Sequence, residues 1–416
     1  MVENITFAHV VLATSLSLLF YTYVGYPILL TLLASLRRDG GEGHHDRVSW
    51  PSVTVVISAY NEETVIGLRI QNLLEVDYPR DKLQILIGSD GSTDGTCDVI
   101  SRYRFAGVKL VACASRKGKA GVLNDLVPRA TGEFVVFTDA NTFYDRDAIK
   151  ELIRGFQACE SACAVVGLLE FRTSSGTVNP DSLYWRYESL LKKLESRFGT
   201  LLGANGAIYA IRRAFYHPLP PGTIVDDFLI PLLMRLDGGG AVVFRPSAKA
   251  WEHTPETVRD EFRRRVRIGA GDAHALIHSW RLLFPTHGML ALCYWSHKVF
   301  RWMGPGLLLT AFISNLFLLN NQWGQVLLGA QLLGYVLGLC APWLRSIPLL
   351  GRVATAISYF IVLNAALLVG FVRFFMGMTG QTWQTTPRTV EAALSSGQPL
   401  GENMRMEKAR ENRPAA

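Results

Sequence analysis

Three short polar motifs lie in the first part of the chain, and each follows a run of apolar residues. They are Ala59-Tyr60-Asn61-Glu62, Ser89-Asp90-Gly91-Ser92-Thr93-Asp94 and Phe137-Thr138-Asp139-Ala140-Asn141. Open α/β sheets bind ligands outside the carboxyl ends of their strands, which is where these motifs would lie. Carboxylates gathered at such an edge repel one another unless a cation lies between them. The motifs therefore predict a site for a divalent metal and a diphosphate.

Asp139 and Asn141 are the most specific candidates for metal binding. They place a carboxylate and an amide oxygen two residues apart, directly after an apolar run. Such oxygen ligands suit Mg²⁺ or Mn²⁺, and phosphate oxygens and water would complete the coordination. An Asx turn is the alternative explanation for this tripeptide, and a helix-capping turn is the alternative for the motif around Asp90. A calcium loop starting at Asp90 is excluded, because Ser101 stands at its twelfth position, where Glu is expected.

The apolar runs alternate with helix-like stretches, and this alternation predicts how the motifs are positioned. The expected strands are Val53–Ser58, Leu83–Gly88, Lys109–Ala112 and Glu133–Thr138. The expected helices include Glu63–Glu75 and Gly95–Tyr103. Alternation of this kind indicates a parallel sheet with right-handed crossover connections.

Three further motifs follow in the second half of the central region. They are Gly203-Ala204-Asn205-Gly206, Ile224-Val225-Asp226-Asp227-Phe228 and Glu261-Phe262-Arg263-Arg264-Arg265-Val266-Arg267-Ile268. Each has a structural explanation of its own: a tight turn, an acidic first turn of a helix and a solvated basic helix face. Their order along the chain, after the first three motifs, favours a shared site.

The whole set resembles the motifs of family 2 inverting glycosyltransferases with the GT-A fold. The similarity is to the membrane type that includes cellulose, chitin and hyaluronan synthases, and it covers about Pro51 to Gly271. It implies an α/β GT-A domain, with a Rossmann-like mixed and mainly parallel sheet, located in the cytosol and flanked by transmembrane helices.

The resemblance also implies roles for individual residues. The implied donor-binding residues are Ala59, Tyr60, Glu62, Asp90, Lys119, Asp139, Arg264 and Arg267, with Asp139 and Asn141 as the metal ligands. The implied acceptor-binding residues are Gly203, Asn205 and Asp226. Asp227 takes the last position of the family's Thr-Glu-Asp motif and is the expected general base, which removes a proton from the acceptor hydroxyl.

Two positions depart from the family pattern. Asn141 replaces the second Asp of Asp-x-Asp, so the metal site carries one negative charge fewer. Ile268 replaces the Trp of Gln-x-x-Arg-Trp, and an aliphatic side chain cannot stack under a terminal sugar. The second departure leaves both single addition and processive polymerisation open. The arginines before it are expected to stabilise the departing nucleoside diphosphate.

Composition indicates that the chain meets a membrane. Hydrophobic residues make up 49% of the 416 residues, charged residues make up 19%, and the net charge is +7. Phe7 to Leu36, Gly304 to Leu344 and Val353 to Val372 are free of charge, and the second run contains a polar break that makes it two spans. Four spans would place the C-terminus outside. The tail is basic, however, and prefers the cytoplasm through Arg388, Arg405, Lys408, Arg410 and Arg413. An interfacial or re-entrant position of one candidate span would remove the conflict, and the sequence leaves it open.

The predicted organisation has six parts. They are an N-terminal transmembrane helix (1–38), a linker (39–50), the GT-A domain (51–275), interfacial amphipathic helices rich in aromatic and basic residues (276–303), C-terminal transmembrane helices (304–377) and a disordered basic tail (378–416). Six scattered cysteines without metal spacing favour a reduced, cytosolic setting for the central domain.

The expected function is transfer of a sugar from a nucleotide donor, expected to be UDP-linked, to a saccharide or lipid-linked acceptor. The reaction would depend on Mg²⁺ or Mn²⁺ and would serve exopolysaccharide or cell-surface glycan synthesis at the inner membrane. Polysaccharide-export proteins are candidate partners, and no nucleic-acid motif is present. The alternatives are a phosphopolyprenol-type sugar transferase and a membrane protein that binds a nucleotide or sugar without chemistry.

Overall fold

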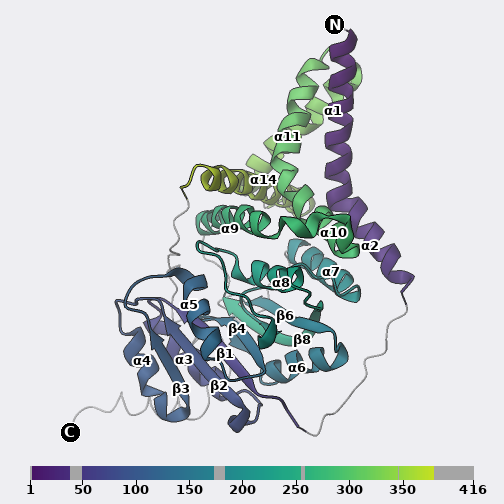
Figure 1. Cartoon of the computed structure of the whole chain (residues 1–416). Coiled ribbons are helices and arrows are strands. Elements are labelled where there is room, and N and C mark those ends of the chain that lie inside the picture. Colours follow the sequence, from purple (N-terminus) through teal and green to yellow (C-terminus); the bar gives the residue numbers. More distant parts are fainter. Residues whose placement is uncertain (1, 38–48, 173–182, 254–257, 345, 379–416) are drawn as a thin grey trace, which may run out of the picture.

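The computed structural model of the chain describes residues 2–37, 49–172, 183–253, 258–344 and 346–378. A sheet-containing domain lies at one end of the molecule, and a narrow projection of helices rises from the other (Figure 1). The predicted linker and the predicted disordered tail lie almost wholly outside the described residues, and the proposed domain boundaries stay a prediction.

One mixed sheet of eight strands forms the domain, in the order β3-β2-β1-β4-β7-β6-β8-β5. The strands are β1 Val53–Ala59, β2 Leu83–Ser89, β3 Val108–Ala112, β4 Phe134–Asp139, β5 Phe143–Tyr144, β6 Ala162–Arg172, β7 Tyr209–Arg212 and β8 Ala241–His253. The first four are parallel, as predicted. β7 is antiparallel to both of its neighbours, β4 and β6, which makes the sheet mixed.

The strand register brings the first and third polar motifs to the same edge of the sheet. Ser58 pairs with Asp139 across β1 and β4, and Ala59 pairs with Ser89 across β1 and β2. Every residue of β1 is buried, as expected for a central strand covered on both faces. The polar motifs therefore begin where the buried strands end.

Helices cover both faces of the sheet. They are α3 Glu63–Leu74, α4 Thr96–Arg102, α5 Gly118–Leu126, α6 Ala148–Ala158, α7 Leu183–Arg197 and α8 Asp226–Leu236. A further helix, α9 Val258–Ser279, packs between α8 and α14. On α3, Ile66, Ile70 and Leu73 recur at helical spacing and are fully buried against the sheet. The opposite face is covered by α5 and α8, whose apolar residues form a second core cluster.

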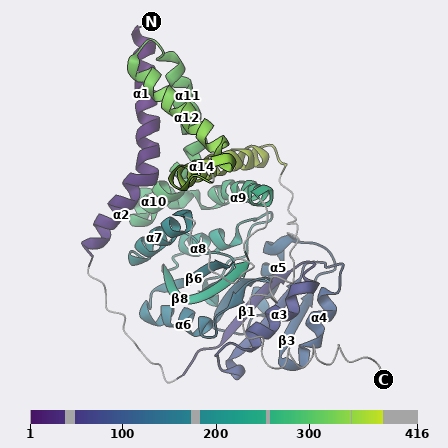
Figure 2. The same cartoon turned by 180° about the vertical axis from the view of Figure 1, so that it is seen from behind.

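The projection contains the two ends of the described chain. Its parts are α1 Val2–Phe20, the π-helical turn η1 Tyr21–Gly25, α2 Tyr26–Ser35, α10 Met289–Cys293, the π-helical turn η8 Tyr294–Val299, α11 Phe300–Phe317, α12 Gln322–Leu339, α13 Ala341–Leu344 and α14 Pro348–Phe375. α1, α11 and α12 point away from the domain, whereas α14 runs crosswise at their foot, beside α9 (Figures 1 and 2). Two segments of the described chain, Phe7–Ser35 and Pro348–Phe375, are long and apolar enough to cross a membrane, by length and composition alone.

The stretch from Trp280 to Trp302, where amphipathic helices were expected, is made of several short elements. It consists of two short 3-10 turns, followed by α10, η8 and the start of α11. Gly288 separates the turns from the helix, with a positive φ of 54° that favours glycine. Its predicted place at a membrane interface stays a prediction.

Candidate active site

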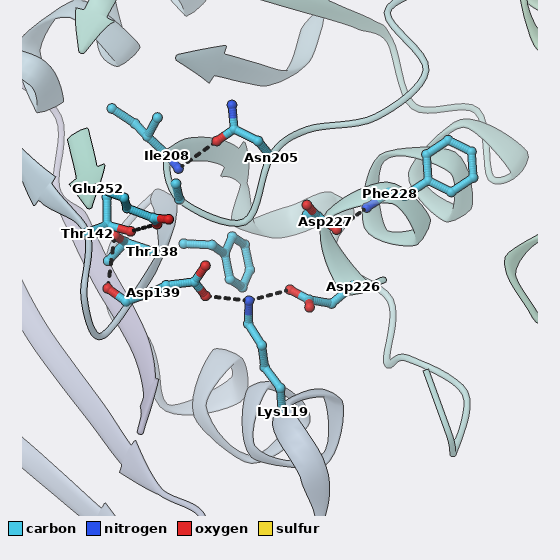
Figure 3. A network of polar contacts seen from close by, with 12 residues as sticks. Lys119, Thr138, Asp139, Thr142, Asn205, Ile208, Asp226, Asp227, Phe228 and Glu252 are labelled. Carbon is cyan, nitrogen blue, oxygen red and sulfur yellow. Dashed lines mark hydrogen bonds and ion pairs between the residues drawn. The ribbon is translucent and has the colours of Figure 1, made fainter. Parts of the chain in front are cut away.

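Lys119 lies between two carboxylates at the edge of the sheet (Figure 3). Its Nζ is 2.7 Å from Oδ1 of Asp139, at the end of β4, and 3.3 Å from Oδ2 of Asp226, the first residue of α8. A β-strand, a helix start and the first turn of α5 thus meet at one ammonium group. Three residues that the sequence assigned to one site, far apart in the chain, are in contact here.

Asp90 binds the start of α5, the helix that carries Lys119. Its carboxylate is fully buried and accepts hydrogen bonds from the backbone N–H groups of Lys117 at 2.6 Å and Gly118 at 3.1 Å. These donors belong to the N-terminal end of α5, where unpaired N–H groups favour an anion. In this structure Asp90 therefore positions the helix that carries Lys119. Its predicted contact with the nucleotide stays a prediction.

The charges in this cluster shift one another's protonation. The pKa of Asp226 is raised to about 6, first because the side chain is buried and then because Asp227 and Asp139 are near, although Lys119 opposes the shift. Burial alone would lower the pKa of Lys119, but Asp139, Asp226 and Asp227 together raise it. Lys119 is therefore a permanent cation among carboxylates.

Asp226 and Asp227 face different ways from the start of α8. Asp226 points to Lys119, whereas Asp227 points away from it (Figure 3). Oδ1 of Asp227 accepts a hydrogen bond from the N–H of Phe228 at 3.0 Å, and its side chain is less buried than that of Asp226. Asp226 is thus paired with the ammonium group of Lys119, whereas the carboxylate of Asp227 is directed to a different part of the site.

The glycine-rich loop is fitted closely around this cluster. A Cβ on Gly203 would lie 2.6 Å from Cδ2 of Phe228, and one on Gly206 would lie 3.2 Å from both Oδ2 of Asp139 and Nζ of Lys119. The N–H of Ala204 donates to the carbonyl of Asp227 at 3.0 Å. The loop and the acidic helix start therefore form one unit.

Asn205 braces the loop from within. Its Oδ1 accepts from the N–H of Ile208 at 3.1 Å, and its Nδ2 donates to the carbonyl of Gly167 at 3.3 Å. These contacts give Asn205 a structural role in this structure, and its predicted role in acceptor binding stays a prediction.

The first motif shapes the far side of the site. Asn61 has a positive φ of 51°, so the chain turns sharply after β1, and its Oδ1 accepts from the N–H of Thr93 at 2.9 Å. The guanidinium of Arg116 stacks 3.6 Å above the ring of Tyr60. Ala59 and Glu62 are buried beneath this surface. A planar cation over an aromatic ring marks a surface on which a flat base could also stack.

Arg267 of α9 is electrostatically coupled to the carboxylates and to Arg264. Solvent reaches Arg267, yet the surrounding protein lowers its pKa, chiefly by burial and next by the charge of Arg264, while Asp139 raises it. The neighbour Arg265 instead binds Glu261 at 2.6 Å and the hydroxyl of Tyr359 at 3.0 Å. Within the arginine run, Arg267 is thus electrostatically linked to the cluster, and Arg265 is structural.

The residues present fit a divalent metal only with help from a ligand. No group of three or more His, Cys, Asp and Glu side chains that could hold a metal exists among the described residues. Asp139 and Asn141 supply two oxygens at the end of β4, and Asn141 is half-buried. That a diphosphate and water provide the other ligands stays a prediction.

Sequence analysis missed two polar residues near this cluster. Glu252 on β8 is buried and accepts from the hydroxyl of Thr142 at 2.5 Å, just beyond Asn141. Tyr209 on β7 is fully buried, and its hydroxyl has no hydrogen-bond partner within the described parts of the chain. Glu252 lies in a strand that no local pattern predicts, and Tyr209 is of a residue type that is ordinary in strands.

Comparison with known proteins identifies the class of this domain. Residues 54–217 match the family model described as "Glycosyl transferase family 2". This segment, less than half of the chain, is thus similar to family 2 glycosyltransferases. The prediction of a glycosyltransferase and of a mixed, mainly parallel GT-A sheet is thereby confirmed. The membrane-synthase subgroup is a finer assignment than this match supports.

Two curated relatives illustrate what this chain is similar to. "Probable glycosyltransferase YdaM" of Bacillus subtilis is 27% identical over 242 residues, covering 55% of this chain and 56% of the relative. Poly-beta-1,6-N-acetyl-D-glucosamine synthase of Staphylococcus aureus is 27% identical over 239 residues, with the same coverage. The chain thus spans little more than half the length of these curated relatives.

A solved structure extends the likeness in fold beyond the family match. A mannosyltransferase from Pyrobaculum calidifontis, in complex with GDP-Man and Mn²⁺, aligns with a TM-score of 0.66 at 22% identity. The alignment covers 88% of this chain and 99% of that one. At this identity the similarity concerns the fold.

Proposed function

We propose that the protein is a membrane-bound, inverting glycosyltransferase that moves a sugar from a nucleotide donor to a saccharide or lipid-linked acceptor. The observation that carries this proposal is the meeting of Asp139, Asp226 and Lys119 beside Asp227. A donor diphosphate needs a cation on one side, and an acceptor needs a base on the other. The two acids of α8 face these two directions.

In the proposed reaction, Asp227 removes the proton from an acceptor hydroxyl. The hydroxyl oxygen forms a bond to the anomeric carbon as the bond from that carbon to the diphosphate oxygen breaks. The electron pair leaves with the nucleoside diphosphate, and the configuration at carbon inverts. No covalent enzyme intermediate is required.

The basic residues stabilise the charge that develops on the leaving group. Lys119 of α5 contacts Asp139 and Asp226, Arg267 of α9 is electrostatically coupled to the same carboxylates, and Arg264 adds a further positive charge. Arginine can grip a diphosphate with two parallel hydrogen bonds. Bound Mg²⁺ or Mn²⁺ would be held by Asp139 and Asn141 and would supply electrostatic stabilisation of the diphosphate.

Uracil is the proposed base of the donor. The support is the resemblance of the first two motifs to the nucleotide-binding motifs of the family. The fold relative was solved with a guanosine donor, so both bases belong in the test. A role in exopolysaccharide synthesis with export partners, and a location in the inner membrane with the domain on its cytoplasmic side, complete the proposal.

The test incubates purified protein with a panel of UDP- and GDP-sugars, with and without Mn²⁺, and measures release of the nucleoside diphosphate. Wild type should release it from one donor in the presence of metal. Asp227→Asn should lower turnover by about 10²–10⁴-fold, because it removes the general base. Glu75→Asn, on the exposed end of α3, is the control. Unchanged turnover in Asp227→Asn would exclude this residue as the base.

A further inference from the structure

The direction of α14 resolves the conflict over the C-terminus. The sequence is basic before this helix, at Arg345 and Arg352, and basic again in the tail. Lys and Arg favour the cytoplasmic side of a membrane. If α14 crossed the membrane, one of its two basic flanks would lie on the wrong side.

α14 packs along α9 with the two backbones in close approach. A Cβ on Gly370 of α14 would lie 2.4 Å from the carbonyl oxygen of Val266 and 2.8 Å from the N of Ala270. A Cβ on Gly269 of α9 would lie 3.2 Å from Cα of Leu367. Two helices in such contact must lie at the same depth relative to a membrane.

α9 cannot lie within hydrocarbon. Its first half carries the arginines Arg263, Arg264, Arg265 and Arg267, which serve the glycosyltransferase site or its support. A single charged side chain at the centre of a bilayer costs about 2.5–3.5 kcal/mol even on the mildest scale. α14 therefore lies at the level of the headgroups or below.

The orientation of α14 agrees with this depth. α1, α11 and α12 rise from the domain, whereas α14 crosses at their foot in both views (Figures 1 and 2). Its N-terminal half contacts α12, where a Cβ on Gly338 would lie 2.6 Å from Cδ1 of Ile361. Asn364, in its middle, lies beside Gly304 of α11.

The outer face of α14 is apolar and exposed. Leu368, Val372 and Phe375 are 49%, 41% and 73% exposed. Arg352 and Arg373 are exposed near its two ends. An apolar face with flanking cations fits the boundary between lipid headgroups and acyl chains.

We propose that α14 is an in-plane helix at the cytoplasmic membrane surface and not a span, with its exposed apolar face inserted among lipids. The chain then crosses the membrane three times, through α1, α11 and α12, and its C-terminus lies on the same side as the glycosyltransferase domain. α11 and α12 are not among the two segments of the described chain that qualify as spans by length and composition, but each has 18 residues and is about 27 Å long, which nearly matches a hydrocarbon core of about 30 Å. This inference rests on the proposed membrane insertion.

Cysteine labelling of the full-length protein in cell membranes tests the topology. In a background with the native cysteines replaced, Asn320→Cys marks the turn between α11 and α12, and Ala416→Cys marks the tail. A membrane-impermeant maleimide added to intact spheroplasts should label the first and not the second. Labelling of both would overturn the inference, because α14 would then cross. Labelling of neither would also overturn it, because the hairpin would then not cross.

A second variant separates this inference from the proposed function. Ala365→Lys places a cation on an exposed position near the middle of α14. An in-plane helix should keep the labelling pattern and the membrane fraction unchanged, whereas a spanning helix should lose insertion. Extraction of wild type by alkaline carbonate would contradict membrane insertion itself, whatever the orientation of α14.

Discussion

At the scale of single residues, Lys119 is the centre of the site. It holds Asp139 and Asp226 together without a metal, at 2.7 and 3.3 Å. A Mn²⁺ ion that binds Asp139 must therefore compete with an ammonium group. The same positive charge would later face the donor diphosphate.

Replacing Lys119 by Met should separate these two effects. Mn²⁺ binding without donor, measured by titration calorimetry, should become tighter by several-fold, because a competing cation is removed. Turnover should fall by roughly 10²-fold or more, because a charge that stabilises the leaving group is lost. Lys109→Met, on the exposed side of β3, should change neither. Weaker Mn²⁺ binding in Lys119→Met would contradict the competition.

The raised pKa of Asp226 predicts a pH dependence of stability. Because the folded protein binds this proton more tightly than the unfolded chain does, stability increases as pH falls from about 6 towards about 4. Above that range the carboxylate is ionised and buried, which lowers the free energy of unfolding. Asp226→Asn should therefore raise the unfolding temperature of the metal-free protein relative to wild type more at about pH 7.5 than at about pH 5.

The control for this pH series is Asp98→Asn, because Asp98 is exposed on α4. Its difference from wild type should be nearly the same at both pH values. A difference for Asp226→Asn that is equally independent of pH would refute the raised pKa.

Sequence alone identified many of these residues but not what they contact. Asp139 was indicated by its place after an apolar run, whereas Lys119 and Asp226 were assigned through the resemblance to a known family. The burial of Asp90 beneath α5 depends on two backbone N–H groups that no side-chain pattern reveals. Tyr209 carries no signal at all, since aromatic residues are ordinary in strands.

At the scale of elements, the glycine-rich loop and α8 act as one unit. The missing Cβ of Gly203 lets the loop lie against Phe228, and the N–H of Ala204 is bonded to Asp227. The position of the proposed base therefore depends on a close backbone approach as well as on its own helix.

Gly203→Ala tests this dependence. The added methyl group would lie 2.6 Å from the Phe228 ring, so the loop or α8 must shift. Overpacking of this kind costs about 1–3 kcal/mol, and turnover should fall by at least about 10-fold as Asp227 moves. Gly306→Ala in α11 is the matched control, since a Cβ there meets no atom within 4 Å. Full activity of Gly203→Ala would show that the loop does not set the position of the base.

The predictable elements were those with local patterns. The four parallel strands are compact apolar runs, so their bounds were found to within one residue at most ends. β8 was not found, because Arg245, Pro246, Ser247 and Lys249 interrupt it and its pairing with β6 is distant in the chain. α14 was found as an apolar segment, but its direction depends on the packing of Gly370 against α9.

At the scale of the whole molecule, a buried charged network joins the N-terminal helices to the domain. His297 of η8 lies between Glu195 and Glu188 of α7, at 2.6 and 3.4 Å. Tyr26 of α2 donates to Glu195 at 2.8 Å, and Arg301 of α11 binds Glu188 at 2.5 Å. Segments from both ends of the chain therefore converge on α7.

Breaking this charged network should lower the stability of the whole folded chain. Glu195→Gln leaves His297 with a weaker partner in a buried site and should cost roughly 3 kcal/mol, seen as a lower unfolding temperature in detergent. The double variant with His297→Gln should lose less than the sum of the two single variants. Glu75→Gln, on an exposed helix end, should have no effect. Additive losses would show that the pair is not coupled.

α9 is a single helix of 22 residues, about 33 Å long, and it touches both halves of the molecule. Arg267 in its first half is electrostatically coupled to the carboxylates of the site, and its middle lies against the backbone of α14. A stiff helix transmits displacement from one end to the other, so lateral pressure or thinning in the surrounding membrane would reach the proposed glycosyltransferase site mechanically. The same polypeptide could then turn over at different speeds in micelles and in nanodiscs without any change in its chemistry.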